Sequence, residues 1–146
     1  MSAAPLARRA ALGRRLASAV YDLLLNAAIA MVATLPFILV AGDATEGWKR
    51  HALQLWDLAW IGAYYVWFWT HGGQTLPMQT WRIRVVRAHD GAPVGLARAL
   101  HRYALAVLGF VALGLGFAWA LVDRDRQFLH DRLAGTALVD ARQAIG

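Results

Sequence analysis

The sequence alternates between three long apolar stretches and shorter polar segments. The apolar stretches cover residues 16–40, 52–70 and 103–122, and their only formal charges are Asp22 and Asp57. Each stretch is close to the roughly 20 residues that a helix needs to cross the apolar core of a bilayer. We therefore expect an all-α membrane protein with three or four membrane helices.

The third apolar stretch admits two topologies, a single span or a short helical hairpin. Three glycines interrupt it, Gly109, Gly114 and Gly116, and the chain could turn near them. A hairpin returns the C-terminal tail to the side of the N-terminus and so places most of the cations on one side, as the positive-inside rule favours. Each arm then has only about 12 residues, or roughly 18 Å, which is too short to cross. We prefer a hairpin or re-entrant pair, and the single span stays open.

The distribution of cations also predicts the orientation of the chain. The N-terminal arm and the middle segment are rich in arginine, whereas the loop between the first two apolar stretches has only Lys49 and Arg50. Short loops rich in Lys and Arg stay in the cytoplasm, so we expect a cytoplasmic N-terminus. A cleavable signal peptide is the competing interpretation, but the first stretch is too long for one and contains Asp22 and Asn26.

Residues 71–102 form the most polar part of the chain. The segment from Trp81 to Val85 alternates with a period of two, which is typical of a half-buried strand. His89-Asp90-Gly91 is a turn signal. We expect a small strand or hairpin at the membrane interface between the second and third apolar stretches, with an extended loop as the alternative.

The composition indicates that lipid is the natural solvent. Hydrophobic residues make up 59% of the 146 residues and charged residues 16%, against about 25% charged in a soluble domain. A chain this short cannot bury so much apolar surface in a water-soluble core. The net charge is +6, from 15 Lys and Arg against 9 Asp and Glu. Because the arginines flank apolar stretches without a nucleic-acid-binding motif, we expect membrane lipids as partners and no nucleic acid.

Asp22 needs an explanation because it lies inside the first apolar stretch. A carboxylate there costs about 2.5–3.5 kcal/mol on insertion scales unless it finds a partner or water. Arg15 precedes it by about two helical turns on the same face, and Asn26 extends the polar stripe. These residues predict either a buried charge pair that sets helix packing or part of an ion or proton pathway. Asn26, Asp57 and Arg132 are secondary candidates.

The sequence contains no catalytic or metal-binding motif. His130 precedes Asp131, but adjacent residues of a helix do not face each other, and no further His or acidic cluster completes a metal site. The chain has no cysteine, and Ser18 lies in no G-x-S-x-G motif. We expect no enzymatic activity, no cofactor and no metal, with lipid modification as a minor alternative.

Four short motifs occur in order along the chain: residues 14–22 (RRLASAVYD), 73–76 (GQTL), 84–86 (RVV) and 129–136 (LHDRLAGT). Together they resemble the RDD family of prokaryotic membrane proteins, which is named for one arginine and two aspartates. The resemblance assigns these to Arg15, Asp22 and Asp131. Family members often carry Gly-Lys where this chain has Pro77-Met78, so a basic residue of that loop is missing here.

The resemblance implies a bacterial inner-membrane protein. We expect a basic cytoplasmic arm over residues 1–13, a membrane domain over 14–139 and a tail over 140–146. If the arginine and both aspartates cluster near the cytoplasmic face, one carboxylate remains in excess and can bind a proton or small cation.

Some relatives are linked to sodium–proton exchange, although the family as a whole has no defined activity. We therefore expect transport or transport-associated activity on a small cation or proton. Three or four helices are too few to enclose a pathway, so we expect a homo-oligomer or a larger membrane complex. The alternative is a non-catalytic membrane subunit that anchors or assembles a partner complex.

Overall fold

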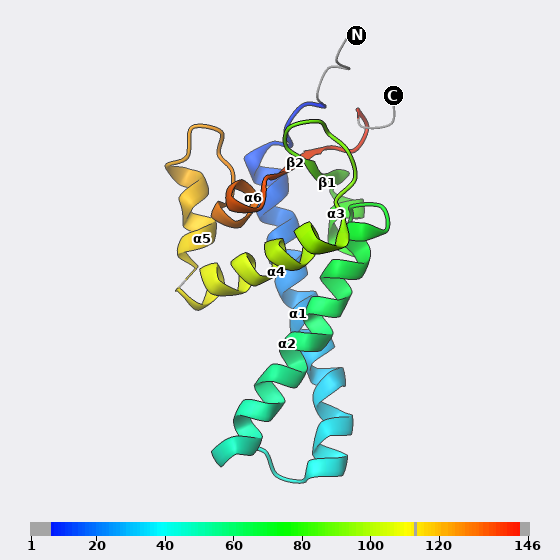
Figure 1. The fold of residues 1–146 in the computed structure, drawn as a ribbon, viewed down its shortest axis with the longest axis vertical. Helices are drawn as coiled ribbons and strands as arrows, with labels where there is room; N and C mark the ends of the chain where they lie inside the picture. Colours follow the sequence, from blue (N-terminus) through cyan, green and yellow to red (C-terminus); the bar gives the residue numbers. More distant parts are fainter. Residues whose placement is uncertain (1–6, 113, 144–146) are drawn as a thin grey trace.

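The computed structural model describes residues 7–112 and 114–143, apart from the side chain of residue 117. Most of the chain is helical (Figure 1), which confirms that part of the expected fold class. The elements in order are α1 (Leu12–Ala41), α2 (Gly47–Thr70), α3 (Leu76–Thr80), β1 (Ile83–Arg87), α4 (Leu96–Val111), α5 (Leu115–Ala118), the 3-10 turn η1 (Trp119–Leu121), α6 (Leu129–Ala134) and β2 (Thr136–Asp140).

Helices α1 and α2 pack together as an antiparallel pair that forms the long arm of the molecule (Figure 1). α1 has 30 residues, about 45 Å at 1.5 Å per residue, and apolar side chains such as Val32 and Leu39 are exposed along it. Within the described part of the chain, α1 is the one helix that is both long and apolar enough to cross a membrane. α2 is also long, with 24 residues, but it is more polar. The expected count of three or four spans is therefore not confirmed.

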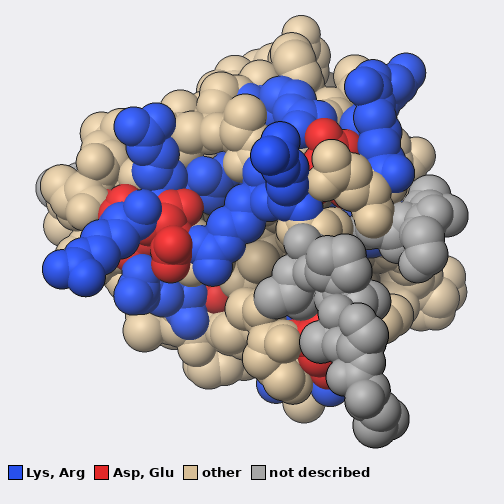
Figure 2. Space-filling model, turned by 90° about the horizontal axis from the view of Figure 1, so that it is seen from above, with Lys and Arg blue, Asp and Glu red and all other residues tan. Residues whose placement is uncertain are grey.

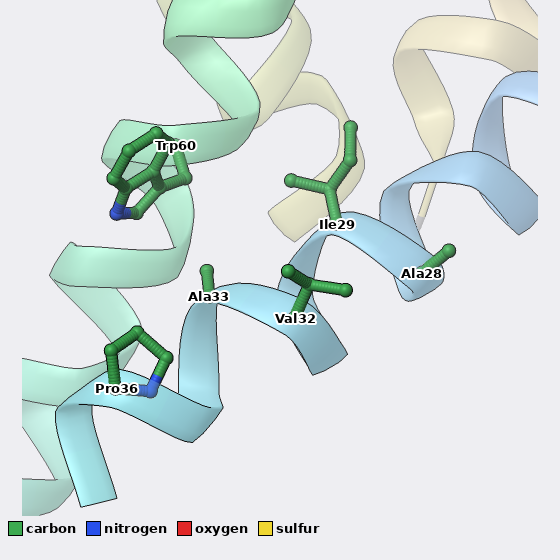
Figure 3. A pocket seen from close by; sticks show the side chains of 6 residues that line it. All are labelled: Ala28, Ile29, Val32, Ala33, Pro36 and Trp60. Carbon is green, nitrogen blue, oxygen red and sulfur yellow. The ribbon is translucent and has the colours of Figure 1, made fainter. Parts of the chain in front are cut away.

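Polar contacts join the two helices of the arm around a proline. Pro36 lies inside α1, and the Trp56 Nε1 donates to the carbonyl of Ala33, 2.8 Å away. The Thr34 hydroxyl donates to the Asp57 carboxylate at 3.2 and 3.3 Å, so Asp57 serves as an acceptor between helices. The apolar groove beside these contacts has a volume of about 420 Å³ and is lined by Ala28, Ile29, Val32, Ala33, Pro36 and Trp60 (Figure 3).

The third apolar stretch folds as a helical hairpin. α4 ends just before Gly114, whose φ of +74° favours glycine, and α5 then turns back toward the end of the molecule that carries the sheet (Figure 1). A Cβ atom on Gly116 would lie 3.1 Å from the Cα of Gly109, so the two backbones are in contact. The 16 residues of α4 span about 24 Å, less than the roughly 30 Å of a bilayer core. Residues 103–122 therefore form a hairpin and not a single span.

The expected strand is present, and it pairs with a strand that is distant in the sequence. β1 pairs with β2 in antiparallel register from Ile83↔Asp140 to Arg87↔Thr136, so of the strand and the hairpin that the sequence allows, the structure has the strand. The turn after β1 closes on itself, because the Arg87 N–H donates to the Ala92 carbonyl at 2.9 Å. Pro93 follows and has no N–H to offer to a sheet.

The segment before α1 joins this sheet through residues 9 and 10. Arg9 forms an antiparallel bridge with Val139, and the Ala10 N–H donates to the Leu138 carbonyl at 2.9 Å. Residues 9–10 and β2 accordingly lie at the same end of the α1–α2 pair (Figure 1). Residues 8–10 of the expected basic arm are thus part of the folded unit.

Candidate functional site

A cluster of buried polar side chains lies where the α1–α2 pair meets the β1–β2 sheet. Its members come from α1, the residue before α3, α4, the loop before α6, α6 and β2. They are Arg15, Ser18, Asp22, Thr75, Arg102, Gln127, His130, Asp131 and Thr136, each less than 9% exposed. Buried polar groups require partners, so their contacts define what the cluster can do.

An ion pair between Arg102 and Asp131 forms the centre of the cluster. The Arg102 side chain is 2% exposed and that of Asp131 1%. Arg102 also donates to the Thr136 hydroxyl at 3.1 Å, and its guanidinium lies 4.5 Å from the centroid of the Trp69 ring. α6 ends at Gly135 in the left-handed conformation, which lets β2 follow at once and places Thr136 beside the pair. The pair therefore links α4, α6 and β2.

Asp22 lies next to this ion pair without contacting it directly. The Thr75 hydroxyl donates to one Asp22 oxygen at 3.2 Å, and Thr75 also caps α3. The other Asp22 oxygen has no hydrogen-bond partner among the described residues, and the buried hydroxyl of Ser18, one turn earlier, makes no hydrogen bond there either. The cation whose field acts on Asp22 is Arg102. Both aspartates thus share one arginine.

Arg15 takes a different position from the one that the resemblance implies. It is buried, at 3% exposed, but makes no ion pair with Asp22 or Asp131 in the described part of the chain. Its guanidinium lies 5.8 Å from the centroid of the Phe128 ring. With Arg102 included, the cluster holds two arginines and two aspartates and is formally neutral. One arginine and two aspartates would leave one carboxylate in excess, but the second arginine removes this excess.

The secondary candidates lie outside the cluster. Asn26 is half-buried on α1, near Tyr65. Asp57 accepts its hydrogen bonds from Thr34. Arg132 is 49% exposed and pairs with Asp123. Both charged candidates therefore have local structural partners.

Sequence reasoning missed Arg102 as the buried cation. Arg102 directly precedes the uncharged stretch 103–122, a position typical of arginines that face lipid headgroups. The helical spacing offers a signal, because Ala99 and Arg102 are three residues apart and both are buried on one face of α4. A cation that shares a face with a small buried residue points inward.

His130 gives the cluster a pH dependence. Its side chain is 6% exposed, and burial together with the charge of Arg102 holds the pKa of His130 well below its ordinary value of 6.5. The unfolded chain takes up a proton below about pH 6.5 and the folded chain does not. His130 therefore contributes stability above pH 6.5 that is lost as the pH falls below it.

We predict that the protein unfolds more easily at pH 5.5 than at pH 7.5, and that His130→Gln reduces this difference by about 1 kcal/mol. Thermal unfolding in detergent at both pH values measures it. Exposed His101 on α4 lies outside the cluster and supplies the control, since we expect His101→Gln to leave the difference unchanged. An equal pH effect in His130→Gln and the wild type would refute the assignment.

No group of three His, Cys, Asp or Glu side chains able to hold a metal occurs among the residues that the structure describes. The chemistry open to the cluster is proton exchange at a carboxylate, or contact with a small cation through carboxylate and hydroxyl oxygens. Asp22, Ser18 and Thr75 are the groups that bring such oxygens together.

Comparison with known proteins identifies the family. The RDD family matches residues 9–135, nearly the whole chain. One relative, Uncharacterized protein RP437 from Rickettsia prowazekii (strain Madrid E), is 29% identical over 79 residues, which are 54% of this chain and 43% of that protein. The match thus covers less than half the length of this relative. No solved structure matches the chain. Because the family match includes both aspartates and both buried arginines, the chain belongs to the RDD family.

Proposed function

We propose that this chain is a multi-pass protein of the bacterial inner membrane with both termini in the cytoplasm. α1 and α2 would cross the bilayer, and the α4–α5 hairpin would lie at its cytoplasmic boundary. The exposed apolar side chains of the arm support this arrangement, as does the pairing of the N-terminal arm with β2. The arginine-rich end of the molecule would then face the cytoplasm, in line with the positive-inside rule.

The activity that we propose is transport, or a role within a transport complex, with a proton or small cation as the moving species. The observation that carries this proposal is Asp22. Its carboxylate is buried in an apolar helix and has one oxygen without a hydrogen bond in the described part of the chain. Such a carboxylate is costly unless it binds a proton or a cation. Arg102, the cation whose charge acts on Asp22, is already paired with Asp131.

The transporting form would be a homo-oligomer or a larger complex. Two long helices and a short hairpin cannot enclose a pathway, so further copies or partners would complete it. The exposed apolar surface of α1 and α2 offers room for such contacts as well as for lipid. The proposal includes no enzymatic step and no cofactor.

Flux measurements in vesicles test the transport proposal. Purified protein is reconstituted with a pH-sensitive dye inside, and an inward sodium or potassium gradient is applied. We expect proton or cation movement by the wild type and a loss of at least tenfold in Asp22→Asn. Asp90→Asn, which removes an exposed carboxylate in the loop after β1, serves as the control. Equal flux in the wild type and Asp22→Asn, or none in either, would reject the proposal.

The alternative is a non-catalytic membrane subunit that anchors or assembles a partner complex. The links that the Arg102–Asp131 pair makes between α4, α6 and β2 favour it, since they give the charges a structural role. This alternative predicts a stable complex that survives purification, and no flux. Asp22→Asn would then leave assembly intact.

A further inference from the structure

Among the residues that the structure describes, Arg15 has no anionic partner to match its burial. Its side chain is among the least exposed of the molecule, yet no hydrogen bond from its guanidinium to an acceptor occurs within the described residues, and its Nε is fully buried without one. Its guanidinium makes a cation–π contact with the Phe128 ring, whose centroid is 5.8 Å away. A buried cation without a counter-charge is strongly unfavourable. This position therefore calls for an anion that the described residues do not provide.

The neighbouring charges increase the excess of positive charge. Arg9 and Arg126 both act on Arg15, and Asp123 is the carboxylate that acts on it. Arg9 has its own partner, Asp125, at 3.0 Å. Arg15 and Arg126 are therefore the two positive charges of this group that still need a counter-charge.

Asp123 is fully occupied by its own loop. It accepts hydrogen bonds from the backbone N–H groups of Asp125 and Gln127, each at 3.1 Å, and pairs with Arg132. It is therefore engaged elsewhere. Arg15 and Arg126 have no ion-pair partner of their own in the part of the chain that the structure describes.

The loop between η1 and α6 is built to hold Arg126 in place. Arg126 has a φ of +50°, which is rare for a side chain of its size. Its N–H donates to the Asp123 carbonyl at 3.0 Å, and the Asp123 side chain ties down the rest of the loop. Strained backbone of this kind persists where the surroundings fix it, and it is concentrated at functional positions.

The site lies at the level where phospholipid headgroups are expected. Arg15 directly precedes the apolar stretch 16–40, and its neighbours Leu16 and Val20 are 40% and 58% exposed. The face at the end of the molecule that carries the sheet is rich in Lys and Arg, with acidic side chains set among them (Figure 2). A group with a negatively charged head and an apolar tail would satisfy both surroundings at once.

We propose that Arg15 and Arg126 bind a phosphate-type oxyanion, with the headgroup of an anionic phospholipid as the source that this position favours. A guanidinium offers paired donors that match two oxygens of a phosphate group. Two arginines without carboxylate partners match the one or two negative charges of such a group. The site is separate from Asp22 and does not depend on transport.

Lipid binding to the intact chain tests this proposal. Native mass spectrometry of the detergent-solubilised protein, titrated with phosphatidylglycerol, measures the affinity. We expect Arg126→Asn to weaken binding about tenfold, the effect of losing one charged hydrogen-bonding partner. Asn suits the left-handed backbone at this position, so the variant keeps the loop. Arg124→Asn removes an exposed charge from the same loop and should stay within about twofold of the wild type.

A second variant and a second probe complete the experiment. Arg15→Met keeps an unbranched apolar side chain but removes the charged guanidinium, and it should weaken phosphatidylglycerol binding as Arg126→Asn does. Inorganic phosphate at millimolar concentration, measured by thermal shift at constant ionic strength, distinguishes the sources. A stabilisation that is lost in Arg126→Asn identifies free phosphate, and its absence alongside lipid binding identifies the headgroup. Equal binding of both probes by the wild type, Arg126→Asn and Arg15→Met would overturn the site.

Discussion

Asp131→Asn is expected to destabilise the protein by about 3–5 kcal/mol, the largest effect that we predict for a single substitution. The change removes the charge that compensates Arg102, whose side chain is 2% exposed. The guanidinium would keep the Thr136 hydroxyl at 3.1 Å, the face of Trp69 and the charge of Asp22, with which it makes no direct contact. Denaturant unfolding in detergent micelles, followed by circular dichroism, measures the loss.

Two further variants separate the buried pair from ion pairs in general. Arg132→Gln breaks the pair with Asp123, but Arg132 is 49% exposed, so we expect at most about 1 kcal/mol. The double variant Arg102→Met with Asp131→Leu replaces both charges by apolar groups and should cost clearly less than the sum of the two single changes. Additive losses would show that the two side chains do not depend on each other.

Gly73→Ala is expected to destabilise the protein by about 3 kcal/mol. Gly73 has a φ of +72°, where a side chain is unfavourable. A Cβ there would also lie 2.6 Å from the Val85 carbonyl oxygen, a backbone atom that cannot move aside freely. The close approach is needed because the Val85 N–H donates to the Gly73 carbonyl at 2.7 Å. This contact fastens β1 to the end of α2.

Gly114→Ala provides the matched control for this substitution. Gly114 has a similar φ of +74°, but a Cβ there would meet no atom within 4 Å, in the turn between α4 and α5. We expect about 1 kcal/mol from the backbone alone, and the difference between the variants measures the contact with Val85. Thermal unfolding of both in the same detergent makes the comparison. Equal losses would mean that the approach of β1 to Gly73 is not tight.

The local elements are readable from the sequence, but long-range pairing is not. The period-two segment near Trp81 predicts a strand, and the strand lies within two residues of it, over Ile83–Arg87. Its partner could not be predicted, because a five-residue strand carries no information about which distant segment completes its ladder. The sequence also leaves open whether residues 103–122 form a hairpin or a single span. The pairing of Arg9 with Val139 favours the hairpin, because it brings β2 back to the segment before α1.

The candidate site is predictable in part. Asp22 stands out by its position in an apolar stretch, and Asp131 by its motif, and both lie in the buried cluster. Arg102 does not stand out, because a cation at the end of an apolar stretch has the same pattern whether it faces headgroups or the interior. Helix rotation decides between these, and rotation depends on packing against α6 and Trp69.

The N-terminal arm and the C-terminal strand form one folded unit, which we place on the cytoplasmic side of the membrane. The chain has no cysteine, so single cysteines can be labelled without interference. Thr45→Cys in the α1–α2 loop and Gln143→Cys after β2 are treated in intact cells with a membrane-impermeant maleimide. We predict that Thr45→Cys reacts and that Gln143→Cys reacts only after the cells are permeabilised. Labelling of Gln143→Cys from outside intact cells would contradict this placement.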